Sequence, residues 1–241
     1  MSALAIFFVA IGITDICRRL TTLRWLPFCC GPAAALGCAL LSGLWHLGDV
    51  VLLVLSSGAI VGWVLLCART ERGGAGQVAP LVVFGTTVAV LGGLAGWASP
   101  VTGLVSHWLP WVGLTAVDPT HAVLIAGVVL VQLVTGNQLV RLVLGSVGAV
   151  RPAGEPQPSD RLKGGRLLGP MERLLILGLG LAGQLAAATA VIAAKGIIRF
   201  PELNAQRREA NGGSTIDELT EYFLVGSFAS WLLALAGVGL A

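Results

Sequence analysis

Polar side chains recur at regular spacing in the apolar C-terminal third of the chain. Arg173, Gln184 and Lys195 are separated by eleven and eleven residues within a long apolar run. On a straight α-helix, eleven residues leave a drift of about 20°, so the three side chains would share one stripe. Ionisable and amide groups inside a membrane helix are typical of a substrate or ion path. The alternative is two interface anchors and one glutamine that bonds to a neighbouring helix.

A second polar group lies in the apolar run that ends near residue 144. Gln132, Thr135 and Gln138 recur at every third residue, and Asn137 and Arg141 are four residues apart. Exposure of such groups to lipid is costly, so we expect them to face the helix bundle and to meet the glutamine of the predicted stripe. A transport path would lie between these two helices. Structural hydrogen bonding between helices explains the pattern equally well.

Charged residues near the predicted helix ends offer other chemistry. Asp15 precedes Arg18 and Arg19 by three and four residues, which predicts local ion pairing. A second charged set flanks the apolar run 171–194 and could bind a lipid phosphate, act on a lipid at the cytoplasmic interface, or form fixed salt bridges. The candidates for a substrate site or path are Gln132, Thr135, Asn137, Arg141, Glu172, Arg173, Gln184, Lys195, Arg199 and Glu221.

A glycine motif invites a cofactor interpretation that the surrounding sequence does not support. Gly178, Gly180 and Gly183 form GxGxxG, which in dinucleotide-binding folds follows a strand of a βαβ unit. The chain that follows is too short and too apolar to complete such a sheet. We therefore expect these glycines to let a neighbouring helix approach or to bend their own helix, and we predict no cofactor.

Metal binding and catalysis have little support in the sequence. His46, His107 and His121 are the candidates for a metal site, but no two are close enough in sequence to form a local metal signature. We predict no metal and no catalytic residue. Whether the protein is an enzyme stays open, and the missing nucleophile–base pairing counts against it. The five cysteines include no CxxC, and none lies in a predicted outer loop, which fits reduced thiols.

The composition indicates that lipid is the solvent of most of the chain. Of 241 residues, 56% are apolar and 11% are charged, whereas a soluble domain has about 25% charged residues. Long unbroken apolar runs favour helices over a barrel. We predict an all-α polytopic transmembrane helical bundle of about seven spans, at residues 2–17, 29–46, 48–68, 79–98, 120–144, 171–194 and 219–240.

The expected organisation is one membrane domain with three parts. These are a five-span region at 1–147, a cytoplasmic Pro/Gly-rich linker at 148–169, and a two-span region at 170–241. Basic residues concentrate on the inner side if the N-terminus lies outside. The segment 195–218 conflicts with this orientation, because it carries four basic residues and would lie outside. The alternative is six spans with a re-entrant hairpin at 174–198, which places all basic residues inside.

Part of the C-terminal region resembles a known family. The segments GRLLGPMERLLI, LAGQ, IAAKGIIRFPEL and EYFLVGSFASW occur in this order within residues 165–231. They resemble a family of uncharacterised bacterial inner-membrane proteins that has no assigned activity, substrate or cofactor. The resemblance implies a bacterial cytoplasmic membrane as the location. The matching positions include Glu172, Arg173, Gln184, Lys195, Arg199 and Glu221.

The sequence favours one function and leaves two others open. We expect a small transporter or channel-like component with a polar path between the fifth and sixth spans. The alternatives are a structural or assembly partner of other membrane proteins and a membrane-embedded enzyme that acts on a lipid. The expected partners are the lipid bilayer and other membrane proteins or a second copy of the chain. A net charge of +3, scattered along the chain, argues against nucleic acid.

Overall fold

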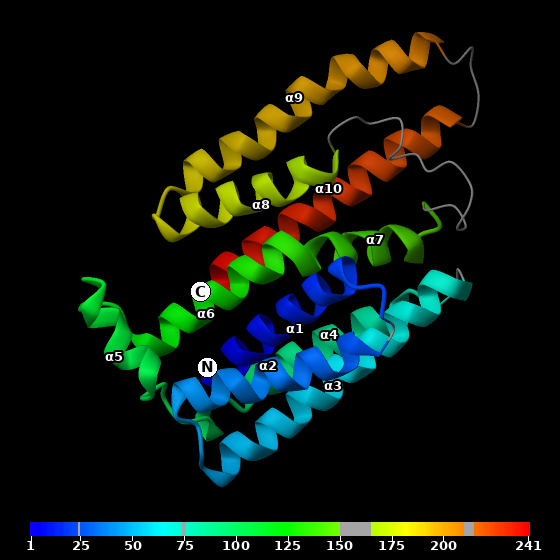
Figure 1. Ribbon diagram of the computed structural model, residues 1–241. Coiled ribbons are helices and arrows are strands. Elements are labelled where there is room, and N and C mark those ends of the chain that lie inside the picture. The colour runs from blue at the N-terminus through cyan, green and yellow to red at the C-terminus, as the bar shows by residue number, and fades with distance from the viewer. Residues whose placement is uncertain (24, 74–75, 150–164, 210–214) are drawn as a thin grey trace. The chain divides into compact units, whose positions relative to one another are not determined.

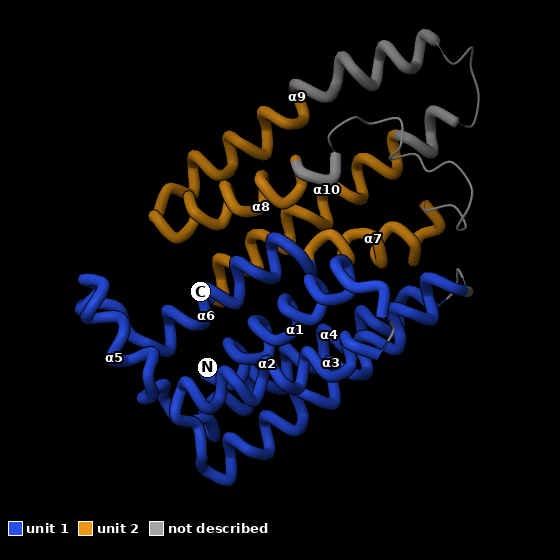
Figure 2. The backbone as a smooth tube through the Cα atoms, in the orientation of Figure 1, with its two compact units in different colours: residues 1–135, 241 blue, residues 136–240 orange. Residues whose placement is uncertain are grey.

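The computed structural model describes residues 1–23, 25–73, 76–149, 165–209 and 215–241 (Figure 1). Regular structure in these residues is wholly helical, which confirms the all-α prediction for the described part of the chain. Two compact units are present, residues 1–135 with 241 and residues 136–240 (Figure 2). The division falls inside the predicted span 120–144.

The core of unit 1 is its first helix. This helix, α1, packs against α2, α3, α4 and α6, and Leu4, Ile6 and Ile11 are fully buried. A helix that is surrounded in this way is apolar over most of its length, as residues 3–13 of this helix are. The unit contains α1 (Ser2–Leu20), α2 (Leu26–Ser42), α3 (Leu47–Gly73), α4 (Val78–Gly93), the 3-10 helix η1 (Ala95–Trp97), α5 (Leu104–Trp111), α6 (Pro119–Leu130) and the π-helix η2 (Val131–Thr135).

Unit 2 is built around a helical hairpin. Helices α8 and α9 pack against each other, and α10 packs against α7, α8 and α9. Ile176, Ala188 and Ala234 form a buried apolar cluster where α8, α9 and α10 meet. The helices of this unit are α7 (Gly136–Ser146), α8 (Gly165–Leu181), α9 (Leu185–Glu209) and α10 (Thr215–Leu240).

The predicted span 171–194 is not one straight helix. Residues 182–184 form a turn in which Gly183 has a φ of 73°, and the Gln184 N–H donates to the Leu179 carbonyl at 2.8 Å. A left-handed glycine just after the last helical residue commonly ends a helix. The prediction that Arg173 and Lys195 share one stripe of a straight helix with Gln184 is therefore wrong. Helices α8 (Gly165–Leu181) and α9 (Leu185–Glu209) form a hairpin about this turn, while re-entry into the membrane over 174–198 stays a prediction.

Two predicted loops are partly helical. The predicted linker 148–169 lies outside the described residues at 150–164, and its last residues belong to α8, which begins at Gly165. The predicted loop 195–218 belongs to α9 up to Glu209. Its residues 210–214 lie outside the described residues, and α10 begins at Thr215. Basic residues of this segment are therefore carried on a helix.

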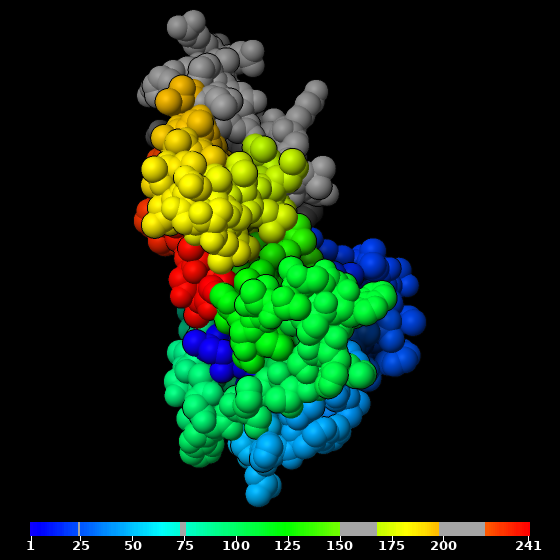
Figure 3. Space-filling model, turned by 90° about the vertical axis from the view of Figure 1, so that its left-hand side faces the viewer, coloured from blue at the N-terminus to red at the C-terminus, as the bar shows by residue number. Residues whose placement is uncertain are grey.

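Length and composition support an integral membrane protein. Three helices in the described part of the chain are long and apolar enough to cross a membrane, at Leu47–Arg72, Pro119–Ser146 and Thr220–Leu240. Large apolar side chains are widely exposed, as in the hairpin (yellow in Figure 3), where Ile197 is 74% exposed. Soluble monomers rarely expose large contiguous apolar patches. The count of seven spans, the bacterial membrane and the orientation stay predictions.

The glycines of the GxGxxG motif differ in their surroundings, which leads to a first testable prediction. A Cβ atom added to Gly180 would lie 2.5 Å from Val238 on α10, whereas one added to Gly178 would meet open space within the described residues. We expect Gly180→Leu to destabilise the protein by about 1–3 kcal/mol, because α10 would have to move away. Gly178→Leu should leave stability unchanged or raise it, because leucine favours the helix. Thermal unfolding of both variants in detergent measures the difference, and equal midpoints would contradict the packing role of Gly180.

Candidate functional site

The charges packed inside unit 2 belong to two hydrogen-bonded sets that start from the adjacent residues Glu172 and Arg173, and the two sets together are called here the Glu172 cluster. Glu172 is 7% exposed and Arg173 is 1% exposed. Charged side chains are almost never this buried unless they are paired. The cluster draws on α7, α8, α9 and α10 and consists of Asn137, Glu172, Arg173, Lys195, Ser230 and Trp231.

Glu172 is the centre of the cluster. Its Oε2 atom accepts a hydrogen bond from the Lys195 ammonium group, across the α8–α9 hairpin. Its Oε1 atom accepts from the indole N–H of Trp231 on α10 at 2.8 Å. Lys195 Nζ also lies 5.8 Å from the centroid of the Trp231 ring, within the range of a cation–π contact. Trp231 therefore stabilises both charges of the pair, one through its edge and the other through its face.

Arg173 points toward oxygen atoms of two other helices. Its Nη1 donates to Ser230 Oγ at 3.1 Å, and its Nη2 donates to Asn137 Oδ1 at 2.7 Å. A Cβ atom added to Gly136 would lie 2.9 Å from Arg173 Nε, so glycine at this position makes room for the guanidinium group. The contact with Asn137 joins polar residues that the sequence assigns to the fifth and sixth spans.

Unit 1 contains a second buried carboxylate, the centre of what we call the Asp15 cluster (Asp15, Arg18, Trp63, Glu71 and Thr135). Asp15 is 3% exposed, and its Oδ1 accepts from Trp63 Nε1 at 3.1 Å and from Arg18 Nη1 at 3.2 Å. Arg18 also donates to Glu71 Oε1 at 3.0 Å. The Thr135 hydroxyl lies near the Asp15 carboxyl group without completing a hydrogen bond.

The π-helix η2 packs against α1 and carries Thr135 of the Asp15 cluster. A π-helix is wider than an α-helix by about one residue per turn and often marks functional positions. Within η2, the Val134 carbonyl accepts a hydrogen bond from Arg19 Nη2 at 2.6 Å. The predicted pairing of Asp15 with Arg18 is therefore confirmed, and the predicted pairing with Arg19 is wrong. Arg19 donates instead to a backbone carbonyl.

The two clusters use the same combination of groups. In each one, a buried carboxylate accepts from a tryptophan indole N–H and from a basic side chain. Among the described residues, no three His, Cys, Asp or Glu side chains are grouped to hold a metal ion.

Comparison of the chain with protein-family models, with curated proteins and with solved structures finds no match. The resemblance over residues 165–231 therefore stays a prediction. Function has to be argued from the two clusters themselves, because a helical bundle alone does not define an activity.

The structure brings together only some of the residues proposed from the sequence. Asn137, Glu172, Arg173 and Lys195 belong to the Glu172 cluster. Gln132 and Thr135 are buried in unit 1, where they lie on η2. The remaining candidates are Gln184, exposed on the hairpin turn, Arg141 and Glu221, exposed on α7 and α10, and Arg199, whose side chain lies outside the described residues.

Sequence reasoning missed the tryptophans that complete both clusters. Trp231 and its neighbour Ser230 lie in the last predicted span, and Trp63 lies in the third. The signal was available in principle, because a buried indole N–H generally needs an acceptor and buried carboxylates are the strongest acceptors. Nothing in the sequence indicated which carboxylate each tryptophan would meet.

The histidines do not form a catalytic relay in the described residues. Ser99 Oγ lies 2.9 Å from His46 Nδ1, and Asp49 Oδ2 lies 3.6 Å from the same nitrogen. In a Ser-His-Asp relay the serine and the carboxylate contact opposite ring nitrogens. Asp49 is instead a structural acceptor, since it also accepts the backbone N–H of Ser99 at 2.8 Å.

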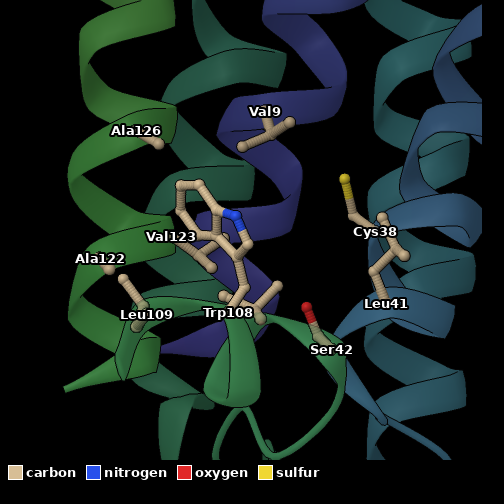
Figure 4. Close-up of a pocket in the computed structure, with 10 residues that line it drawn as sticks. Val9, Cys38, Leu41, Ser42, Trp108, Leu109, Ala122, Val123 and Ala126 are labelled. Carbon is tan, nitrogen blue, oxygen red and sulfur yellow. The ribbon is translucent and has the colours of Figure 1, made fainter. Parts of the chain in front are cut away.

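Unit 1 also contains a cavity of about 220 Å³ with an apolar lining (Figure 4). Trp108 from α5 stands in the view between α6 and α2. No charged side chain lines the cavity, so it suits an alkyl chain better than a polar substrate. The lining residues are Val9, Cys38, Leu41, Ser42, Val105, Trp108, Leu109, Ala122, Val123 and Ala126.

Proposed function

We propose that the protein is a small membrane transport component in which the Glu172–Lys195 pair binds and releases a transported proton. The observation that supports this proposal is the burial of Glu172 and Arg173, with Glu172 paired to the half-buried Lys195, in a chain that has helices long and apolar enough to cross a membrane. Ionisable residues inside membrane segments are rare and mark ion and substrate pathways.

Stability alone is a poor explanation for these charges. Transfer of an ion pair from water into a protein interior is costly, and well-packed apolar residues of similar volume often stabilise as much or more. The chain is rich in leucine, valine and alanine, and residues of this kind could fill the positions of Glu172 and Lys195. A functional use of the two charges therefore explains the pairing of Glu172 with Lys195 better than stability does.

The α8–α9 hairpin provides a moving part for such a protein. Protonation of Glu172 removes its negative charge and releases the Lys195 ammonium group from the carboxylate. The contact joins α8 to α9, and these helices are connected by the turn at Gly183. Loss of the contact would allow the two helices to part about that turn, while Trp231 still offers its ring face to Lys195.

Proton flux into proteoliposomes tests this function without knowledge of a substrate. The purified protein is reconstituted with an internal pH-sensitive dye, and a potassium diffusion potential is imposed. We expect flux above that of protein-free vesicles, a loss of at least about tenfold for Glu172→Gln, and unchanged flux for Glu221→Gln, a matched change at an exposed glutamate. Only monodisperse protein is reconstituted. Absence of flux in the unaltered protein, or equal flux in both variants, would refute the proposal.

A role as an assembly partner is the second candidate, and one observation favours it. Gly58 and Gly62 lie on α3 at the four-residue spacing of close helix packing, and Gly92 on α4 and Gly96 on η1 have the same spacing in sequence. A Cβ atom added to Gly58, Gly92 or Gly96 would meet open space within the described residues. These faces could receive helices of another protein. An assembly partner would carry no flux of its own in the same vesicles.

A further inference from the structure

Two cysteines from different helices of unit 1 are in direct contact. Cys17 on α1 and Cys30 on α2 have their Sγ atoms 3.0 Å apart, and both residues are half-buried free thiols. A disulfide bond is about 2.05 Å long, so the sulfur atoms need to close by about 1 Å. The neighbouring Cys29 is exposed, which means that successive α2 cysteines point in different directions.

The backbone of α2 explains why these thiols meet. A Cβ atom added to Gly31 would overlap Ile60 and lie 2.6 Å from Thr14 Oγ1. Glycine at this position therefore lets α2 approach α1 and α3 closely. Thr14 and Cys17 are one helical turn apart on α1, and Gly31 and Cys30 are adjacent on α2, so both contacts belong to one tightly packed interface.

We propose that Cys17 and Cys30 are a redox-active pair that forms a reversible disulfide between α1 and α2. The oxidant is a low-molecular-weight disulfide, RSSR. One protein thiolate attacks RSSR, which forms a mixed disulfide and releases RS⁻. The second protein thiolate then attacks the protein sulfur of the mixed disulfide and releases a second RS⁻. The two cysteines lose two protons and two electrons in total, and RSSR becomes two RSH.

The Cys17–Cys30 disulfide would form beside the charged residues of the Asp15 cluster on α1. Cys17 lies two residues after Asp15 and one residue before Arg18, which donates to that aspartate. A covalent link to α2 at this position would fix the segment of α1 that carries the Asp15 cluster. Reversible disulfides inside cells are usually regulatory or catalytic, and a contact between two otherwise free thiols fits that role. This inference stands independently of the proposed transport function.

Two variants with matched cysteine pairs test the proposal. One retains only Cys17 and Cys30, the other only Cys17 and Cys29, with serine at the remaining cysteine positions. Both are incubated in detergent with oxidised glutathione and digested with trypsin without reductant. Cleavage after Arg18, Arg19 or Arg24 separates the Cys17 peptide from the α2 peptide unless a disulfide joins them.

We expect joined peptides from the Cys17/Cys30 variant, their separation by dithiothreitol, and at least about tenfold less joining in the Cys17/Cys29 variant. The unaltered protein, treated in parallel, should yield a joined peptide that fragmentation assigns to Cys17 and Cys30. The unaltered protein also shows whether the disulfide forms when no serine substitution has disturbed folding. Equal joining in both variants, glutathione adducts without joining, or no joining in the unaltered protein would overturn the proposal.

Discussion

Replacement of Glu172 by alanine should lower the free energy of unfolding by about 3–5 kcal/mol, which is the largest effect that we expect from a single change. The side chains of Glu172 and Lys195 are 6% and 16% exposed. Without the carboxylate, the Lys195 ammonium group and the Trp231 indole N–H lose their acceptor in a poorly hydrated site. Removal of one partner of a buried ion pair typically costs this amount, because the other charge is left uncompensated.

A double variant separates the ion pair from other effects of the substitution. Glu172→Ala combined with Lys195→Met removes both charges and should recover a substantial part of the lost stability. Unfolding in mixed detergent micelles, followed by circular dichroism, gives the free energies. Glu221→Ala is the matched control at an exposed glutamate and should change stability by less than about 0.5 kcal/mol. A loss of similar size in this control, or a double variant weaker than Glu172→Ala, would contradict the account.

Asp15→Leu should be the second most damaging change, at about 3 kcal/mol. The substitution leaves the buried Trp63 indole N–H without its acceptor and removes one of the two carboxylates that Arg18 contacts. Glu71→Gln alters the other carboxylate on the same arginine. Because Glu71 is 45% exposed, that change should cost less than about 1 kcal/mol.

The comparison between Asp15 and Glu71 is informative because both carboxylates share Arg18. The same unfolding measurement applies to both variants. If Glu71→Gln proves as costly as Asp15→Leu, then the arginine contact would be decisive and burial of the carboxylate would matter little. A small effect of Asp15→Leu alone would indicate that Trp63 and Arg18 find other acceptors and that the Asp15 cluster is not structurally essential.

Residue type singled out charged residues that the structure places in hydrogen-bonded contacts, whereas the expected arrangement on one straight helix was wrong. Glu172, Arg173 and Lys195 stood out because charges are rare in apolar segments, and the structure places all three in one cluster. Their expected arrangement depended on a straight helix through residues 171–194. Gly183 ends that helix, so two residues predicted near opposite faces lie on adjacent arms of a hairpin. A glycine within an apolar run does not reveal whether it packs, bends or reverses the chain.

The polar residues of the predicted fifth span illustrate a second limit. Gln132 and Thr135 are buried, as expected of amides and hydroxyls in apolar helices. They do not meet Gln184, which is exposed on the turn. Residues 131–135 adopt a π-helix, which changes the face presented by the residues that follow it. Asn137 contacts Arg173 in unit 2. Simple 3.6-residue periodicity cannot predict that change of face.

Contacts at long sequence separation were beyond the reach of local patterns. The cysteine count gave no reason to pair Cys17 with Cys30, and the single local motif near Asp15 contained no tryptophan. The all-helical prediction succeeded because it depended on composition and on apolar run length, which every segment expresses locally.

The central position of α1 has a consequence for the order in which unit 1 can assemble. Helix α1 packs against α6, which follows it in the chain, and a Cβ atom added to Gly12 would lie 2.9 Å from Leu130 Cβ. More than a hundred residues separate these two positions. At about 5–20 residues per second, ribosomes need roughly 6–24 s to make that length. Throughout this interval α1, with Asp15 and Arg18, can contact only the neighbouring helices that precede α6 in the chain, which are α2, α3 and α4. Completion of the unit around its first helix must therefore wait until α6 emerges, whereas the α8–α9 hairpin can close as soon as its own short segment has been translated.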